Sequence, residues 1–184
     1  MRLAVPLVLL AGCGGGSAPA TTPVAPLAPL VNRPPPLPSG WTHFRDPAQR
    51  LSFGVPPGWT ARRSGGSVEV RSADRALALT VAVDRKADGA APAAYVAATL
   101  RALGGYAGLR ARPARAVVDA PYPAASASAT GTLRSTGVRQ RIVAIALEPV
   151  SGTICSVLAF ASANTARGRY VAPLAGLVRT VFVR

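Results

Sequence analysis

The stretch at residues 51–59 reads LSFGVPPGW. Apolar side chains alternate with small ones at Leu51, Phe53 and Val55, which predicts a half-buried β-strand. Two prolines with fixed φ angles followed by a glycine suit a tight turn, so we expect the strand to end at Val55. The turn then delivers Trp59 to the core. This stretch therefore predicts a domain whose core contains a β-sheet.

Downstream segments repeat this pattern of short strands separated by turn residues. Apolar and small or polar side chains alternate, as in strands, at residues 68–70, 77–83, 124–133, 139–147 and 153–161. Turn residues separate neighbouring segments at 72–75, 135–137 and 149–152. Consecutive hairpins imply antiparallel pairing. Gly131, inside one of these segments, indicates a bulge or a frayed strand end.

Two further segments have the periodicity of helices. The first begins at Pro92, a residue favoured in a first helical turn, and one face carries Val96, Leu100 and Leu103. Gly104 and Gly105 are expected to end this helix with a left-handed cap. The second helix is predicted after Pro173, and its apolar face consists of Leu174, Leu177 and Val178. Strands and helices in this arrangement predict an α+β domain.

The two ends of the domain carry a family pattern. An aromatic strand (WTHF) at residues 41–44 is followed by an Asp46-Pro47 turn, the strand ending in VPPGW and a hydrophobic tail at residues 174–182. This combination resembles the PsbP-like family, named for the extrinsic photosystem II subunit and including many bacterial lipoproteins. The resemblance implies an antiparallel sheet with helices packed against it. We expect residues 41–184 to form one α+β domain, an antiparallel sheet of about six strands flanked by two helices.

The N-terminus has the features of an export signal. Residues 3–10 are apolar and follow one basic residue, and Leu10-Ala11-Gly12-Cys13 resembles the lipobox of bacterial lipoprotein precursors. The apolar run is much shorter than the roughly 20 residues that span a bilayer. The resemblance implies a signal peptide at residues 1–12 and lipid attachment to Cys13. An ordinary secretory signal with an incidental cysteine is the alternative.

Residues 13–40 are rich in proline and glycine and almost free of charge. Such a composition mixes flexible chain with polyproline II structure, so this segment is expected to be a linker. An acylated Cys13 would hold the protein on membrane lipid, with the domain facing the periplasm or the exterior. The choice between cell membrane and outer membrane stays open, because it depends on the envelope of the organism.

The chain is strongly basic, with 21 Lys and Arg residues against 7 Asp and Glu and a net charge of +14. Codon bias in a GC-rich genome explains the arginines as simply as selection does. Among the scattered arginines, Arg62-Arg63 form one close group, and Arg110, Arg112 and Arg115 form another. Nucleic-acid modules interleave basic residues with aromatic ones on one face, so no nucleic-acid partner is expected. Anionic lipid headgroups or envelope polymers are the expected partners of this charge.

The sequence predicts no catalytic, metal or cofactor site. Cys155 stands alone in an apolar strand, as is typical of a buried small hydrophobe, and nothing places the sole histidine, His43, beside it. The seven acidic residues, Asp88 among them, form no spaced acid pair and no metal-ligand cluster. Asp119 is expected in a solvated loop, with an acid near a cleft as the alternative.

Three functions follow from these features. The first is a membrane-anchored, non-catalytic lipoprotein of the cell envelope that binds or scaffolds another envelope protein or an anionic polymer. The second is a module that binds a small apolar or anionic molecule in a cleft between sheet and helix, with an arginine as the charged contact. An enzyme comes third, since it would need polar side chains clustered in such a cleft.

Overall fold

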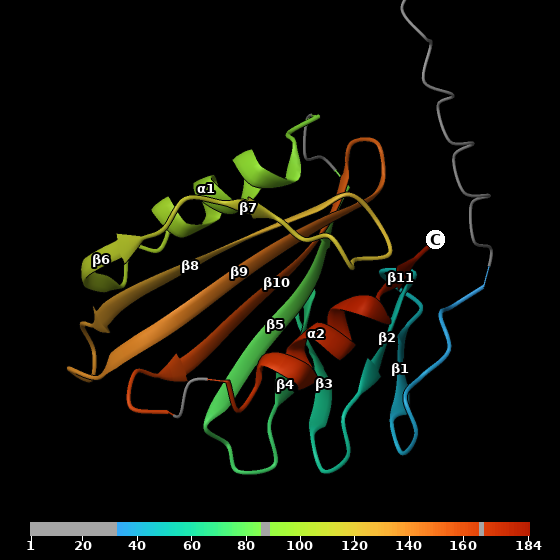
Figure 1. Cartoon of the computed structure of the whole chain (residues 1–184), viewed down its shortest axis with the longest axis horizontal. Helices are drawn as coiled ribbons and strands as arrows, with labels where there is room; N and C mark the ends of the chain where they lie inside the picture. Colours follow the sequence, from blue (N-terminus) through green and yellow to red (C-terminus); the bar gives the residue numbers. More distant parts are fainter. Residues whose placement is uncertain (1–32, 86–88, 166–167) are drawn as a thin grey trace, which may run out of the picture. The chain divides into compact units, whose positions relative to one another are not determined.

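The computed structural model describes residues 33–85, 89–165 and 168–184. In this structure the stretch LSFGV forms strand β2 (Leu51–Val55) (Figure 1). β2 is the middle strand of a small antiparallel sheet, between β1 (Thr42–Asp46) and β11 (Phe182–Val183). In the turn after it, the Trp59 N–H donates to the Pro56 carbonyl over 3.1 Å. Trp59 packs against the core. The predicted strand, turn and approach of Trp59 to the core are confirmed. The prediction that this strand is half-buried is wrong, because all five residues of β2 are buried.

A larger antiparallel sheet contains eight strands within the described residues. The strand order is β3-β4-β5-β10-β9-β8-β6, and the short β7 also pairs with β8. The strands are β3 (Thr60–Ser64), β4 (Ser67–Arg71), β5 (Leu77–Asp84), β6 (Tyr106–Ala111), β7 (Arg115–Ala116), β8 (Ala124–Leu133), β9 (Arg139–Val150) and β10 (Thr153–Ser162). Two meanders, β3 to β5 and β8 to β10, therefore meet side by side at β5 and β10 (Figure 1).

The prediction of a sheet of about six strands flanked by two helices is wrong. Within the described residues the fold has eleven strands in two sheets and is dominated by those sheets. β3 escaped the periodicity argument because this edge strand is mostly exposed and polar, with the sequence TARRS. β7 is only two residues long and β6 contains a glycine, so neither shows an alternating pattern. The α+β class still describes the chain.

The two helices lie on opposite faces of the large sheet. α1 (Pro92–Arg101) buries Val96 and Leu100 in a cluster with Ile142 and other even-numbered residues of β9. α2 (Val171–Arg179) buries Leu177 and Val178 in a second cluster that contains Ile145 and Leu147. Successive residues of a strand point to opposite faces, so β9 supplies one face to each helix. Both predicted helices are confirmed, and Pro173 lies in the first turn of α2.

The expected left-handed cap at Gly104 and Gly105 is wrong. α1 ends at Arg101, and its cap residue Ala102 has right-handed helical angles, with φ of −74°. The Ala102 N–H still donates to the Ala98 carbonyl over 2.9 Å. Neither glycine has a positive φ. The helix therefore ends without the left-handed turn that a glycine pair permits.

Gly131 is needed for a different reason from the one predicted. It pairs in regular register with Gln140 of β9. The irregularity lies in the opposite strand, β6, where the register shifts between Ala107 and Arg110. There the Leu109 backbone crosses residue 131 so closely that a Cβ on this residue would lie 3.3 Å from the Leu109 Cα. A glycine at 131 makes room for the bulge of its neighbour.

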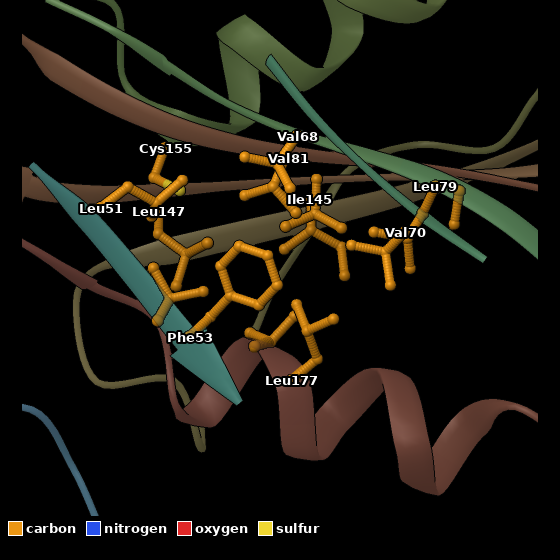
Figure 2. Packing of buried hydrophobic residues seen from close by; sticks show 14 of the residues in the cluster. Leu51, Phe53, Val68, Val70, Leu79, Val81, Ile145, Leu147, Cys155 and Leu177 are labelled. Atoms are coloured by element: carbon orange, nitrogen blue, oxygen red, sulfur yellow. The ribbon is translucent and has the colours of Figure 1, made fainter. Parts of the chain in front are cut away.

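The main core lies between β2, α2 and the inner face of the large sheet (Figure 2). Phe53 is fully buried and its ring lies between Leu177 of α2 and the side chains of the large sheet. Leu147 of β9 and Cys155 of β10 belong to the same cluster. Fully burying a side chain such as phenylalanine contributes about 1.5–3 kcal/mol. Strand β2 therefore lies at the centre of the core.

A tryptophan and two glycines fix α2 against the small sheet. A Cβ at Gly176 of α2 would lie 2.6 Å from Trp41 Cη2, and one at Gly54 of β2 would lie 3.0 Å from Trp41 Cε3. The indole therefore fills the space left by both missing side chains. In addition, the Gly54 N–H donates to the buried Thr180 hydroxyl, Oγ1, over 2.8 Å. Leu37, which falls in the predicted linker, also lies against Gly54.

Gly176→Ala should test this fit in a double-mutant cycle with Trp41→Phe. In a helix the change from glycine to alanine normally stabilises by about 1 kcal/mol. Here the clash with Trp41 should outweigh that gain, because overpacking costs about 1–3 kcal/mol. We expect urea unfolding to show a loss of stability for Gly176→Ala alone. In the Trp41→Phe background, whose ring is shorter, the same change should be neutral or stabilising. An equal effect in both backgrounds would contradict the fit.

Candidate functional site

Strand β8 separates apolar from polar side chains on its two faces. Ala127 and Ala129 are buried in the cluster under α1. Ser128 and Thr130 alternate with them and are half-exposed on the other face, the one that also carries α2. The large sheet therefore presents hydroxyl groups on this face, beside the region that α2 covers.

Three arginines surround these hydroxyl groups. Arg110 of β6 pairs with Thr130 of β8, which in turn pairs with Arg141 of β9. Paired residues of neighbouring strands point to the same face, so the three side chains form one row across the sheet. We call the pocket lined by Arg110, Arg112, Ser128, Thr130, Arg141 and Val171, with a volume of about 430 Å³, the arginine pocket.

The ion pairs of the described residues do not include the arginines of the arginine pocket. Within the described part of the chain, the ion pairs link Asp46, Glu69, Asp74 and Asp119 to arginines elsewhere: Arg62, Arg63, Arg71, Arg169 and Arg179. Among the described residues, none of the side chains that line the pocket is acidic. Arg141 is half-buried, and Arg110 and Arg112 are exposed. Guanidinium groups that converge without a carboxylate partner attract anions.

An apolar cavity of about 100 Å³ adjoins the arginine pocket under the N-terminal end of α2. The two spaces share Arg141, Gly168 and Val171 as walls. The apolar lining consists of Leu77, Val143, Ala159, Ala161, Tyr170 and Leu174. The cavity and the pocket therefore form a single recess, which is apolar on one side of these shared residues and cationic on the other.

A second apolar cavity of about 330 Å³ lies on the β8 side of α2. It shares Val143, Val171 and Leu174 with the first cavity. Val118 and Val171, which are 92% and 67% exposed, lie on its walls. Exposed apolar side chains around a recess are typical of a binding groove. We refer to the two cavities together as the α2 cleft.

Tyr170 holds the start of α2 in place beside the cleft. Its hydroxyl donates to Asp74 Oδ2 over 2.6 Å, and the Ser72 hydroxyl donates to Asp74 Oδ1 over 2.6 Å. These hydrogen bonds, that of Ser72 first, hold the pKa of Asp74 well below its usual range. Tyr170 also contacts the edge of Trp59, with ring centroids 6.1 Å apart. The mouth of the cleft is therefore tied to the turn between β4 and β5.

The structure does not bring together the residues that were considered for a catalytic role. Cys155 is fully buried in β10, and His43 is exposed on β1 of the other sheet. Asp119 is exposed as expected, pairs with Arg179 over 3.0 Å and lies on the wall of the larger apolar cavity. Cys13 and Asp88 lie outside the described residues, so lipid attachment to Cys13 stays a prediction.

No three His, Cys, Asp or Glu residues in the described part of the chain lie close enough together to hold a metal ion. None of its helices is long and apolar enough to cross a membrane.

Sequence reasoning found part of the arginine pocket. It noted Arg110, Arg112 and Arg115 as a group, and the structure places the first two in the pocket and the third on β7, outside it. Arg141 was missed, because only the register of β6, β8 and β9 aligns it with Arg110. Alternate Ser and Thr residues in β8 were the available signal for a polar face.

A buried acid was missed as well. The sequence indicates only a turn residue at Asp46. In the structure, however, Asp46 is 3% exposed and pairs with Arg63 over 3.2 Å. It also accepts a hydrogen bond from the Ala48 N–H over 3.0 Å, as a turn residue does. Arg63 lies on β3, a strand that was not predicted, so this cationic partner of Asp46 could not be predicted either.

No protein-family model matches the chain, and no curated protein matches it. Among solved structures, it is similar to cyanobacterial PsbP (CyanoP) of Synechocystis, with a TM-score of 0.55 and 15% identity over 78% of this chain and 92% of that one. It is also similar to the yeast Ran-binding protein Mog1p, with a TM-score of 0.55 and 9% identity over 78% and 95%.

A third similar structure is a Bacteroides thetaiotaomicron protein, with a TM-score of 0.53 and 11% identity over 77% of this chain. The match spans about half of that protein, 48% of its length. At these identities the likenesses show the fold alone. The chain therefore adopts a PsbP-like fold, as the sequence resemblance implied.

The environment of Cys155 predicts an inert thiol. Burial raises its pKa to about 12. In the Cys13→Ser chain, where Cys155 is the sole cysteine, we expect alkylation by iodoacetamide at mildly alkaline pH to be roughly a thousandfold slower in the folded than in the unfolded state. Mass spectrometry measures this rate. Rapid labelling of the folded chain that slows in a His43→Ala variant would instead indicate an activated cysteine.

Proposed function

We propose that the protein is a non-catalytic binding module of the cell envelope, held at a membrane by lipid on Cys13. The observation that carries the binding role is the recess beside α2, in which three arginines adjoin an apolar cavity and no acid of the described residues lines the arginine pocket. Binding sites are typically concave and mostly apolar, with a few polar groups that orient the ligand. The recess has this composition.

The fold supports a binding role. One structurally similar protein, yeast Mog1p, is by its name a Ran-binding protein. We infer from this only that such a fold suits recognition. The arginines of the pocket favour an anionic envelope component as the partner of the present chain.

Recognition through a sheet edge is the weaker candidate. β3 forms one edge of the large sheet and is mostly exposed. However, it carries Arg62 and Arg63, and charged side chains on an edge strand oppose the addition of another strand. The recess beside α2 is therefore the better candidate for the binding surface.

Lipid on Cys13 would dominate retention at the membrane. Each buried methylene contributes about 0.8 kcal/mol, and two or three acyl chains on one cysteine meet the requirement for stable anchoring. Exposed arginines add about 1 kcal/mol each near an anionic surface and are screened by salt.

The anchoring is tested by Cys13→Ser in the native host. We expect the wild-type chain in the membrane fraction, with an acylated N-terminal Cys13 in its mass spectrum, and the variant outside that fraction. Cys155→Ser is the matched control, because it removes the other cysteine and should leave fractionation unchanged. Membrane retention of the Cys13→Ser chain, or a bare Cys13 on the wild type, would contradict the proposed anchor.

A further inference from the structure

We propose that the recess beside α2 binds a single-chain alkyl phosphate, with the phosphate in the arginine pocket and the chain in the α2 cleft. This inference rests on the proposed binding function and names the chemical class of the ligand. It follows from three features of the described residues: convergent arginines, an adjoining apolar cavity and exposed apolar walls.

The arginine pocket fits a phosphate group. Arg110 and Arg141 lie on either side of Thr130 in one row, and Arg112 follows directly after β6, the strand that carries Arg110. Guanidinium groups donate two parallel hydrogen bonds to a phosphate, and hydroxyl groups such as that of Thr130 donate a third. A phosphate monoester carries a charge of about −1.5 to −2 near neutral pH, which suits three arginines better than one carboxylate does.

The end of α2 adds to this potential. Val171, the first residue of α2, lines the arginine pocket, and the first turn of α2 contains no acidic residue. The N-terminal end of a helix carries partial positive charge, which favours an anion beside it. The N-terminal end of α2 and the arginines therefore both contribute positive charge to the same pocket.

The α2 cleft fits an alkyl chain. Its smaller cavity, about 100 Å³, is lined by Leu77, Ala159, Ala161 and Leu174 and shares Arg141 with the arginine pocket. Engineered apolar cavities of roughly 150 Å³ hold a benzene molecule, so this one has room for several methylene groups. The larger cavity, about 330 Å³, continues along the other side of Leu174 and Val171.

An alkyl phosphate would contact both the arginines and the apolar walls of the recess, whereas an inorganic anion or a charged polymer would contact the arginines alone. Either of these would occupy the arginines and leave Val171, which is 67% exposed, facing water. Burying two methylene groups is worth about a tenfold gain in affinity. The apolar walls therefore have a role only if the bound anion carries an apolar chain.

The test is isothermal titration of the full chain carrying Cys13→Ser with four probes: octyl phosphate, inorganic phosphate, octanoate and octyl glucoside. We expect octyl phosphate to bind once per chain and about tenfold or more tightly than each of the other three. Added salt should weaken its binding, because the headgroup contacts are ionic. The Cys13→Ser variant lacks the cysteine of the proposed lipid anchor, so the titration and the fractionation experiment can fail independently.

Variants separate the two ends of the recess. Arg141→Gln should weaken octyl phosphate about tenfold. Arg101→Gln removes the same charge from the exposed end of α1, on the other face, and should have no effect. Ala161→Leu should fill the smaller cavity and remove the advantage of octyl phosphate over inorganic phosphate. Val171→Gln, at an exposed position, tests the apolar wall without threatening the core, and urea unfolding checks that each variant folds.

Several results would overturn the inference. Equal affinity for octyl phosphate and octyl glucoside would mean that the arginines recognise no headgroup. Equal affinity for octyl and inorganic phosphate would mean that the cleft takes no chain. In a further titration with a long polyphosphate, tight binding of that polymer without saturable binding of octyl phosphate would identify the recess as a surface for an anionic polymer.

Discussion

The packing of Trp41 between Gly54 and Gly176 is the constraint on which the rest of the structure depends. A side chain at either glycine would occupy the space of the indole. The Gly54 N–H also donates to the buried Thr180 hydroxyl, which in turn donates to the Leu177 carbonyl at the end of α2. The small sheet and α2 are therefore joined by close packing and by a buried hydrogen-bonded hydroxyl. With α2 held there, Leu177 reaches Phe53 and closes the main core (Figure 2).

The position and length of α2 leave part of the large sheet open. Nine helical residues span about 14 Å, whereas seven neighbouring strands span about 29 Å. α2 covers the inner face near β5 and β10, and the face of β8 and β6 carries hydroxyl groups and arginines instead of apolar side chains. The recess forms where the covered and uncovered regions meet. An apolar cavity beside a cationic pocket is a direct consequence of a short helix on a wide sheet.

Periodicity was a good guide wherever one face of an element is buried and the other is exposed. β8 and α1 were predicted on that basis, and both helices and the antiparallel pairing are confirmed. β3 could not be found this way, because the strand is mostly exposed and Ala61 is its only apolar residue. Gly131 shows a second limit, since its role comes from Leu109 on another strand. The arginine pocket needs the same kind of information: Arg110 and Arg141 are aligned only by the register of three strands.

Hydrogen exchange of the Gly54 amide is the most direct test of the contact between β2 and α2. This N–H is buried and bonded to the Thr180 hydroxyl, so we expect it to exchange only through global unfolding, with an opening free energy equal to that from urea denaturation. The amide of Val157, in the centre of the large sheet, should give the same value, and that of Gly66, in an open turn, should exchange rapidly. Exchange of Gly54 through a much smaller opening, with Val157 still protected, would show that the large sheet does not depend on this contact.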